Sequence, residues 1–208
     1  MEMENTCIML TTPFYTPVDL RCIFEEVDLM GEGVVLDSHI TIVYAKEQII
    51  PREDILKDMI VFLGEEFDDF ENMLKNDDKF KVMDLFDLDV FENKDTAYVI
   101  LKMKKEGMGW DYLENINKAL SRKYDIKSDF NEYNPHITIA QVKPGKAGKY
   151  LDSKKLRLIL EDSKIGVDDV IVSYGVPEEG NWKQYHITNY HALDRFFKIE
   201  ESKNMPLY

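Results

Sequence analysis

The sequence predicts an α+β fold: two antiparallel sheets with helices on their outer sides, a central cleft, and a pseudo-twofold arrangement of two halves. Apolar runs of strand length alternate with segments whose apolar residues recur at helical spacing. The order of these elements in the first half of the chain is approximately repeated in the second half. At the matching place in each half stands the same tetrapeptide, His-Ile-Thr-Ile, which begins at His39 and at His136.

Composition restricts the classes of function. The chain has 208 residues, 44% of them apolar, which is enough for one domain with its own core. With 26 Lys and Arg against 40 Asp and Glu, the net charge of −14 repels polyanions, so we expect no long nucleic acid as partner. A small anionic ligand in a local pocket stays possible.

Cysteine use and the chain ends indicate the compartment. Cys7 and Cys22 are too few for a disulfide framework, and we expect both to be reduced core thiols. The first thirty residues carry six acids and no basic segment followed by an apolar one, and no apolar run is long enough to span a membrane. We therefore expect a cytoplasmic protein with no membrane partner.

The first half opens with an apolar strand at 7–10. A hydroxyl, a proline and an acid over 16–19 are typical of a helix start, so we expect a helix from there to about Leu29, ended by Gly31 and Gly33. Its inward positions are four apolar residues, namely Leu20, Ile23, Phe24 and Val27. After it we expect a strand over 34–45, an amphipathic helix that opens at Pro51, and a hairpin of 79–91 with 96–104.

The second half follows the same order. It comprises a helix over 110–124, a strand from His136, a helix around 156–160 and a hairpin of 169–174 with 182–188. No linker separates the halves, so we expect one domain over 1–190 with halves of about 1–105 and 106–190, followed by a C-terminal tail over 191–208.

The spacing within each tetrapeptide has a physical meaning. Alternate side chains of a strand share a face, so His39 and Thr41 point to one side, about 7 Å apart along the strand. The aliphatic residues between and after them, and Tyr44, are expected to point to the other side. His136 and Thr138 obey the same rule.

If the halves pack as pseudo-twofold mates, two imidazoles and two hydroxyls converge on the cleft. That set suits a phosphodiester: one imidazole accepts a proton from the attacking oxygen, the other protonates the leaving oxygen, and the hydroxyls bind the non-bridging oxygens. Imidazole has an ordinary pKa of about 6.5 and can serve in either role near neutrality. No metal or other cofactor is required.

The two tetrapeptides, the element order, Pro135 before the second His and an aromatic residue in the last strand, Tyr185, together resemble the 2H phosphoesterase superfamily. This is the bilobal fold of 2′-5′ RNA ligase-like proteins and cyclic phosphodiesterases. The resemblance implies that His39 and His136 are the acid/base pair and that Thr41 and Thr138 bind the phosphate. It also implies metal-free cleavage of 2′,3′-cyclic phosphates, 2′-5′ oligonucleotides or cyclic nucleotides.

The resemblance has one departure and one biological implication. Gln141 stands where relatives of the RNA ligase-like branch often carry a basic residue, which disfavours a large RNA substrate. Members of this size also occur in viruses, where they degrade nucleotide alarm signals of the host, so an anti-defence role is implied.

Further residues are candidates for substrate binding. His186 begins a third His-x-Thr, on a closing hairpin, and with Trp182 it could border the cleft. Six basic residues against one acid over 143–157 form either a solvated face or a loop that steers a phosphate through Lys143 and Lys146. Aromatic residues near strand ends either stack on a nucleobase or pack at the rim, and these are Tyr133, Phe14 and Tyr15.

The sequence thus predicts a phosphodiesterase for a small cyclic or 2′-5′-linked nucleotide. The alternative is a module that binds a nucleotide without turning it over. A metal hydrolase is a third reading, weakened because each His-x-Thr offers one ligand per strand.

Overall fold

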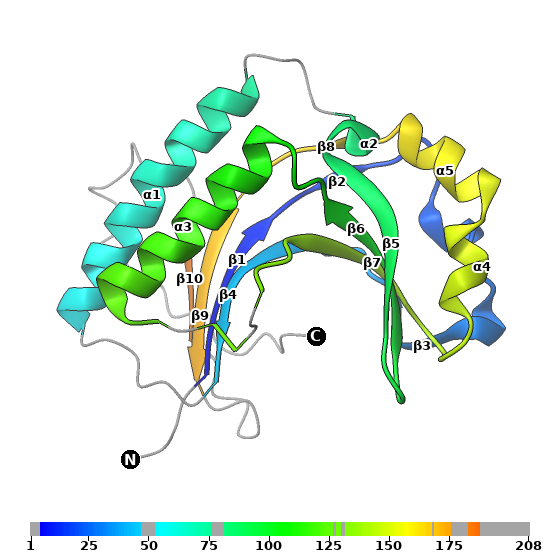
Figure 1. The fold of residues 1–208 in the computed structure, drawn as a ribbon, viewed down its shortest axis with the longest axis horizontal. Coiled ribbons are helices and arrows are strands. Elements are labelled where there is room, and N and C mark those ends of the chain that lie inside the picture. Colours follow the sequence, from blue (N-terminus) through cyan, green and yellow to red (C-terminus); the bar gives the residue numbers. More distant parts are fainter. Residues whose placement is uncertain are drawn as a thin grey trace.

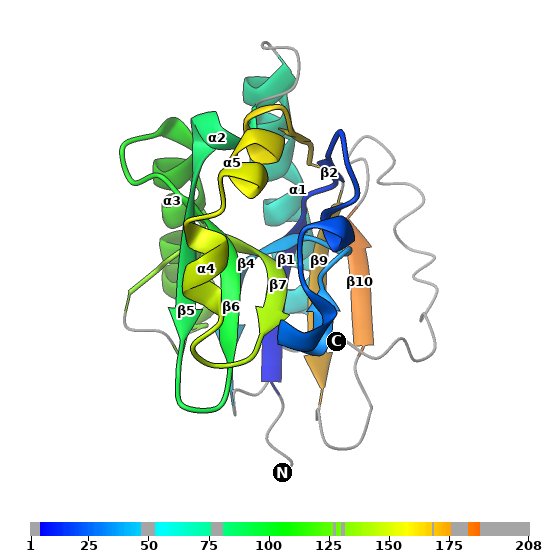
Figure 2. The same ribbon diagram turned by 90° about the vertical axis from the view of Figure 1, so that its right-hand side faces the viewer.

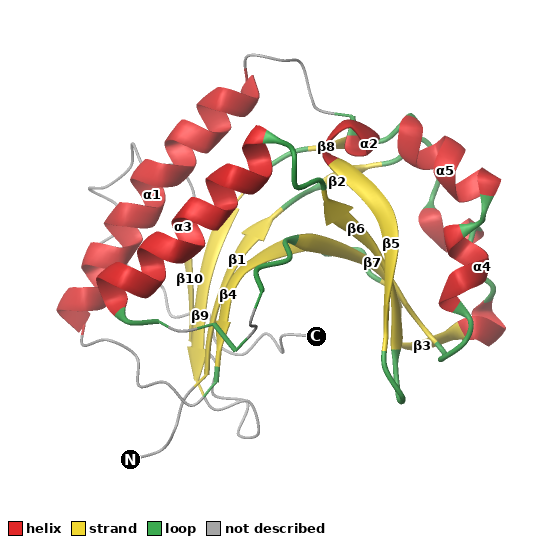
Figure 3. Ribbon diagram, in the orientation of Figure 1, coloured by secondary structure: helices red, strands yellow, loops and turns green. Residues whose placement is uncertain are grey.

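The computed structural model describes residues 5–46, 53–75, 81–126, 128–129, 132–167, 169–175 and 183–187. Two four-stranded antiparallel sheets form an arch, and the helices lie on its outer side (Figures 1 and 3). The predicted α+β class with antiparallel sheets and outer helices is confirmed. The predicted tail over 191–208 lies outside the described residues.

The first sheet has the order β10-β9-β1-β4, and every neighbouring pair is antiparallel. Its strands are β1 (Asn5–Thr11), β4 (His39–Ala45), β9 (Asp169–Gly175) and β10 (Lys183–Ile187). Two helices cover its outer face, α1 (Glu53–Lys75) and α3 (Met108–Tyr124) (Figure 1). The predicted closing hairpin of β9 with β10 is confirmed.

The second sheet has the order β3-β7-β6-β5. Its strands are β3 (Leu29–Val34), β5 (Phe86–Glu92), β6 (Ala97–Met103) and β7 (His136–Val142). On its outer side lie α4 (Ala147–Leu151) and α5 (Lys154–Glu161), which face the viewer in Figure 2. A helical turn, α2 (Val82–Leu85), precedes β5, and the short strands β2 (Phe14–Tyr15) and β8 (Lys164–Ile165) pair with each other.

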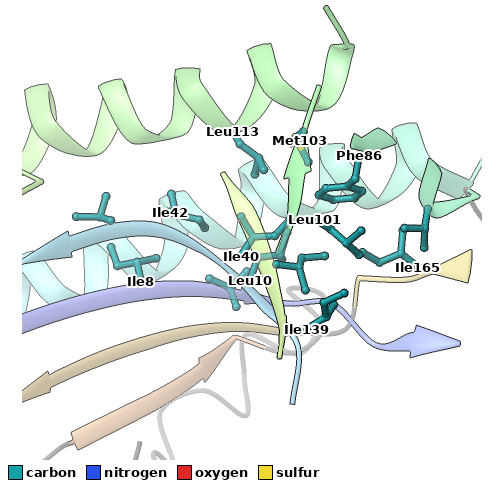
Figure 4. Close-up of a cluster of buried hydrophobic side chains, with 14 of the residues drawn as sticks. Ile8, Leu10, Ile40, Ile42, Phe86, Leu101, Met103, Leu113, Ile139 and Ile165 are labelled. Carbon is teal, nitrogen blue, oxygen red and sulfur yellow. The ribbon is translucent and has the colours of Figure 1, made fainter. Parts of the chain in front are cut away.

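One continuous core joins both sheets to the helices. Ile40 of β4, Leu101 of β6 and Ile139 of β7 meet near its centre, and Leu113 of α3 packs above them (Figure 4). The outward residues of each motif strand are therefore part of the core, as the alternation predicts.

Each sheet contains strands from both halves of the chain. The first sheet combines β1 and β4 with β9 and β10, and the second combines β3, β5 and β6 with β7. The division of the chain near residue 105 thus does not coincide with the division between sheets. The exchange brings β4 and β7, the two motif strands, against each other.

The predicted helix over 16–29 is wrong. Two 3-10 turns, Leu20–Cys22 and Glu26–Asp28, occupy this segment, and Val27 is 70% exposed. Asp19 caps the first turn by accepting from the backbone N–H of Arg21. The extended backbone at 25 then interrupts the helix, and buried Asp28 is bound by Tyr150 and Lys149 of α4. Tertiary bonds thus outweigh the local helical preference.

Three smaller predictions also differ from the structure. The glycines expected to end that helix lie within β3, where Gly31 and Gly33 have φ of +54° and +69°. The strand expected over 34–45 is broken between β3 and β4. Cys7 is buried as predicted, but Cys22 is exposed, because the 3-10 turn that carries it lies at the surface.

No helix within the described ranges is long and apolar enough to cross a membrane.

Candidate active site

Both motif strands carry a β-bulge at the same place. Ile8 and Met9 of β1 pair with Val43 and Thr41 of β4, so Ile42 has no partner on β1. In the second sheet, Val99 and Ile100 of β6 pair with Ala140 and Thr138 of β7, and Ile139 is the extra residue. The bulge therefore follows the threonine directly in each motif.

The bulges are stabilised from outside the strands. The carbonyl oxygen of Ile42 accepts a hydrogen bond of 2.7 Å from Nδ2 of Asn117 in α3. The carbonyl oxygen of Ile139 accepts one of 3.0 Å from the backbone N–H of Val35. Buried carbonyls need such partners, so these two bonds support the local geometry of the motifs.

The histidines and threonines lie on the inner side of the arch. His39 and Thr41 are half-buried, whereas Ile40 and Ile42 belong to the core, and the second motif shows the same pattern. Because the helices in the described part of the chain lie over the outer faces (Figure 1), the polar side of each motif is the side turned away from them. The predicted alternation therefore holds up to the bulge.

The two histidines make equivalent backbone contacts. Nδ1 of His39 is 3.3 Å from the carbonyl oxygen of Asp37, and Nδ1 of His136 is 2.8 Å from that of Asn134. A carbonyl can only accept, so each Nδ1 must carry the proton. In the neutral ring Nε2 then holds the lone pair, which makes Nε2 the atom that can exchange a proton with a ligand.

His136 has the more enclosed environment. Its ring lies 4.7 Å from that of Phe91, edge to face. Burial lowers the pKa of His136, the positive charges of His39 and Lys102 lower it further, and the hydrogen bond to Asn134 opposes the shift. The effect of His39 on this pKa agrees with the contact between β4 and β7, the strands that carry the two imidazoles. At neutral pH His136 is therefore mainly neutral and able to accept a proton.

Through the bulges, two residues reach this face that strand alternation alone would not place there. Tyr44 was expected to point away from His39, but the inversion of the alternation after Ile42 brings it to the half-exposed face of the motif. Gln141 takes the equivalent position in β7, and its Oε1 accepts from the backbone N–H of Glu32 at 3.3 Å. A bulge leaves no signal in the sequence that would reveal it beforehand.

Phe91 and Lys102 were missed for a different reason. Lys102 lies opposite His136 in the sheet, and Phe91 comes from β5. Neither carries a motif, and only the pairing of β5, β6 and β7 brings them to the histidine.

The structure places the predicted aromatic residues in different surroundings. The ring of Tyr133 packs 6.2 Å from that of Trp110, and its buried hydroxyl has a pKa raised by burial. Phe14 lines a pocket of about 220 Å³ together with Ser38, the residue before His39. Tyr15 is 56% exposed on β2. Of the three, Phe14 is thus the one placed beside a motif.

The two lysines predicted to steer a phosphate, Lys143 and Lys146, contact residues outside the two motifs. Nζ of Lys143 donates to the carbonyl oxygen of Val27 at 2.6 Å, and Nζ of Lys146 lies 3.8 Å from the carboxylate of Asp28. Both lysines follow Val142, the far end of β7, which lies about 20 Å along the strand from His136. The structure therefore does not bring them to the motif pair.

Of the two remaining candidates, His186 lies on β10. Trp182 lies outside the described residues. Nδ1 of His186 is 2.6 Å from Oδ2 of Asp169. The strand that carries His186, β10, is the edge of the first sheet opposite to β4. In the part of the chain that the structure describes, no three His, Cys, Asp or Glu side chains are grouped as a metal site.

Comparison with known proteins adds little to this geometry. No protein-family model matches the chain, and no curated protein matches it. Among solved structures, E. coli LigT complexed with 3′-AMP is 14% identical, with 86% of this chain and 95% of that chain covered and a TM-score of 0.41. A structure described as a phosphoesterase is 11% identical, with coverages of 86% and 99% and a TM-score of 0.37. Likeness at this level does not show the activity or the ligand of this chain, because one fold can host many functions.

Proposed function

We propose that this protein is a phosphodiesterase of the 2H type, which cleaves a small nucleotide by general acid–base catalysis from His39 and His136. The observation that carries the proposal is the equivalence of the two motifs. In each, a backbone carbonyl holds Nδ1, Nε2 is left for proton exchange, and a threonine follows on the same face. A nucleotide-binding protein without catalysis would not need two imidazoles poised in this way.

The lowered pKa of His136 suggests a division of labour. His136, mainly neutral near pH 7, removes the proton from the attacking oxygen. His39, in its protonated form, supplies a proton to the leaving oxygen. The hydroxyls of Thr41 and Thr138 donate to the non-bridging oxygens of the phosphate. The attacking group is the free ribose hydroxyl next to the scissile phosphate, which is the 3′-hydroxyl in a 2′-5′ linkage and the 2′-hydroxyl in a 3′-5′ linkage; its attack yields a 2′,3′-cyclic phosphate and releases the 5′-oxygen. Water attacks when the substrate is itself a 2′,3′-cyclic phosphate.

Overall charge favours a compact substrate. The net charge of −14 repels long polyanions. A small nucleotide carries few charges, so the protein repels it much less. We include 2′-5′ oligoadenylates, cyclic dinucleotides and trinucleotides, and 2′,3′-cyclic phosphates in this class. An anti-defence enzyme that degrades nucleotide signals of a host would act on the same class.

The test is turnover with EDTA present, by the unaltered protein, His39→Asn and His136→Asn, on a panel of these nucleotides resolved by chromatography. Asparagine retains a donor near the position of Nδ1 and removes Nε2, so the contact with the backbone carbonyl is kept. We expect product from the unaltered protein and a loss of about 10²–10⁴-fold in each variant. Circular dichroism and thermal unfolding of all three proteins verify folding.

Three results would contradict the proposal. Tight binding of a nucleotide without turnover would indicate a protein that captures nucleotides. Activity abolished by EDTA and restored by a divalent cation would indicate a metal hydrolase. Activity within tenfold of the unaltered protein in either variant would exclude that histidine from acid–base catalysis.

A further inference from the structure

His186, which begins the third His-x-Thr copy, lies on the same face as the first motif. Thr41 of β4 is opposite Met9 of β1, Met9 is opposite Ile171 of β9, and Ile171 is opposite His186 of β10. Directly paired residues of antiparallel strands project to the same side of the sheet. Thr41 and His186 are therefore the two ends of one row across the inner face.

A buried acid holds the ring of His186. Nδ1 of His186 is 2.6 Å from Oδ2 of Asp169, which is buried, while 47% of the His186 side chain is exposed. Asp169 is opposite Thr11, and Thr11 is opposite His39, so this carboxylate lies in the next row of the same face. With Nδ1 engaged, Nε2 is the nitrogen that can meet a ligand. In the protonated ring, Nε2 donates a hydrogen bond to an anion.

The separation of the row's ends limits the size of the ligand. Three strand spacings separate β4 from β10, so Thr41 and His186 are about 14 Å apart. A single phosphate cannot reach both. The two residues between them, Met9 and Ile171, are apolar. Met9 is only 6% exposed, whereas Ile171 is half-buried, so a phosphate at each end with a nucleoside against Ile171 matches the chemistry of the row.

We propose that His186, positioned by Asp169, binds a second phosphate of the ligand. The ligand is then a nucleotide with two or more phosphodiester groups, linear or cyclic, in preference to a mononucleotide. The inference rests on the proposed function, because the phosphate at Thr41 is the one that the two motifs would cleave.

The experiment measures binding separately from turnover. In the His136→Asn background, calorimetry gives the Kd of 2′,3′-cyclic AMP, cyclic di-adenylate and 2′-5′ triadenylate. His186→Asn is added to this background, because asparagine can still donate to Asp169 while it lacks Nε2. Gln184→Ala is the matched control, since Gln184 is also on β10 and on the same face, one row further along.

We expect His186→Asn to weaken the tighter of the two larger ligands about tenfold, as for a lost charge-assisted hydrogen bond, and to change 2′,3′-cyclic AMP by less than about twofold. Gln184→Ala should leave all three Kd values unchanged. Equal weakening of all ligands, no weakening of the larger ones, or larger ligands that bind no more tightly than 2′,3′-cyclic AMP would overturn the inference. Thermal unfolding shows whether either variant has lost its fold.

The two experiments distinguish an error in the second phosphate position from an error in the proposed function. Turnover by the unaltered protein with no selective effect of His186→Asn refutes the second phosphate position alone. Selective weakening by His186→Asn without turnover by the unaltered protein refutes the enzyme and retains the position.

Discussion

Replacement of Asn117 by alanine tests whether the bulge of the first motif depends on α3. Nδ2 of Asn117 donates to the carbonyl oxygen of Ile42 at 2.7 Å, and the register shift leaves Ile42 without a partner residue on β1. Ile42 is 1% exposed, so water cannot readily replace the lost donor. A buried carbonyl left without its partner costs about 1–3 kcal/mol.

Asn115→Ala is the matched control, because it makes the same change at an exposed position of the same helix. Both variants gain the same helix propensity, about 0.6 kcal/mol, which cancels in the comparison. We expect urea unfolding at constant m-value to show Asn117→Ala less stable than Asn115→Ala by about 1–3 kcal/mol. We also expect a lower kcat/KM for Asn117→Ala, because Thr41 is the residue before the bulge. A difference in unfolding free energy below about 0.5 kcal/mol would refute the role given to Asn117.

Three further predictions concern the second motif and β3. The lowered pKa of His136 means that the unfolded chain binds a proton more readily, so the free energy of unfolding should fall as pH drops from about 6.5 through the lower folded pKa. Urea unfolding at pH 7.5 and pH 5 should show a smaller fall for His136→Gln, and an equal fall would contradict this. Phe91→Ala should expose His136 and move the acidic limb of the pH profile of kcat/KM to higher pH, whereas an unmoved limb would show that Phe91 does not contribute to the burial. Gly31→Ala should destabilise the protein by about 1–2 kcal/mol or more, because Gly31 has φ of +54° and the new methyl group would meet the side chain of Gln141. Thermal and urea unfolding measure this loss of stability. Unchanged stability would refute the prediction.

Local sequence patterns were sufficient to predict a large part of the fold. The helical spacing at 110–124 and the apolar strand that begins at His136 correspond to α3 and β7. Within each motif, alternation correctly separated the half-buried histidine and threonine from the buried aliphatic residues. These features depend on neighbours a few residues apart, which the sequence contains directly.

Local patterns failed where distant bonds compete with them. The segment over 16–29 has the apolar spacing and the start of a helix, but α4 binds Asp28 through Lys149 and Tyr150. The alternation around Tyr44 likewise predicted the wrong face, because a bulge inverts it. At 16–29, contacts far along the chain outweighed a helix preference worth less than about 1 kcal/mol per residue. At Tyr44, the register of β4 against β1 decided the face.

By itself, the sequence determined two polar strand faces, each with one histidine and one threonine, and the helices that cover the opposite faces. Tertiary structure alone decided that β4 and β7 lie together, that Phe91 encloses His136, and that His186 shares a face with Thr41. The physical reason is the distance along the chain between the residues on which each feature depends. Side-chain alternation and helical spacing follow from the geometry of a single strand or helix, whereas strand order and register depend on how much apolar surface the whole chain can bury at once.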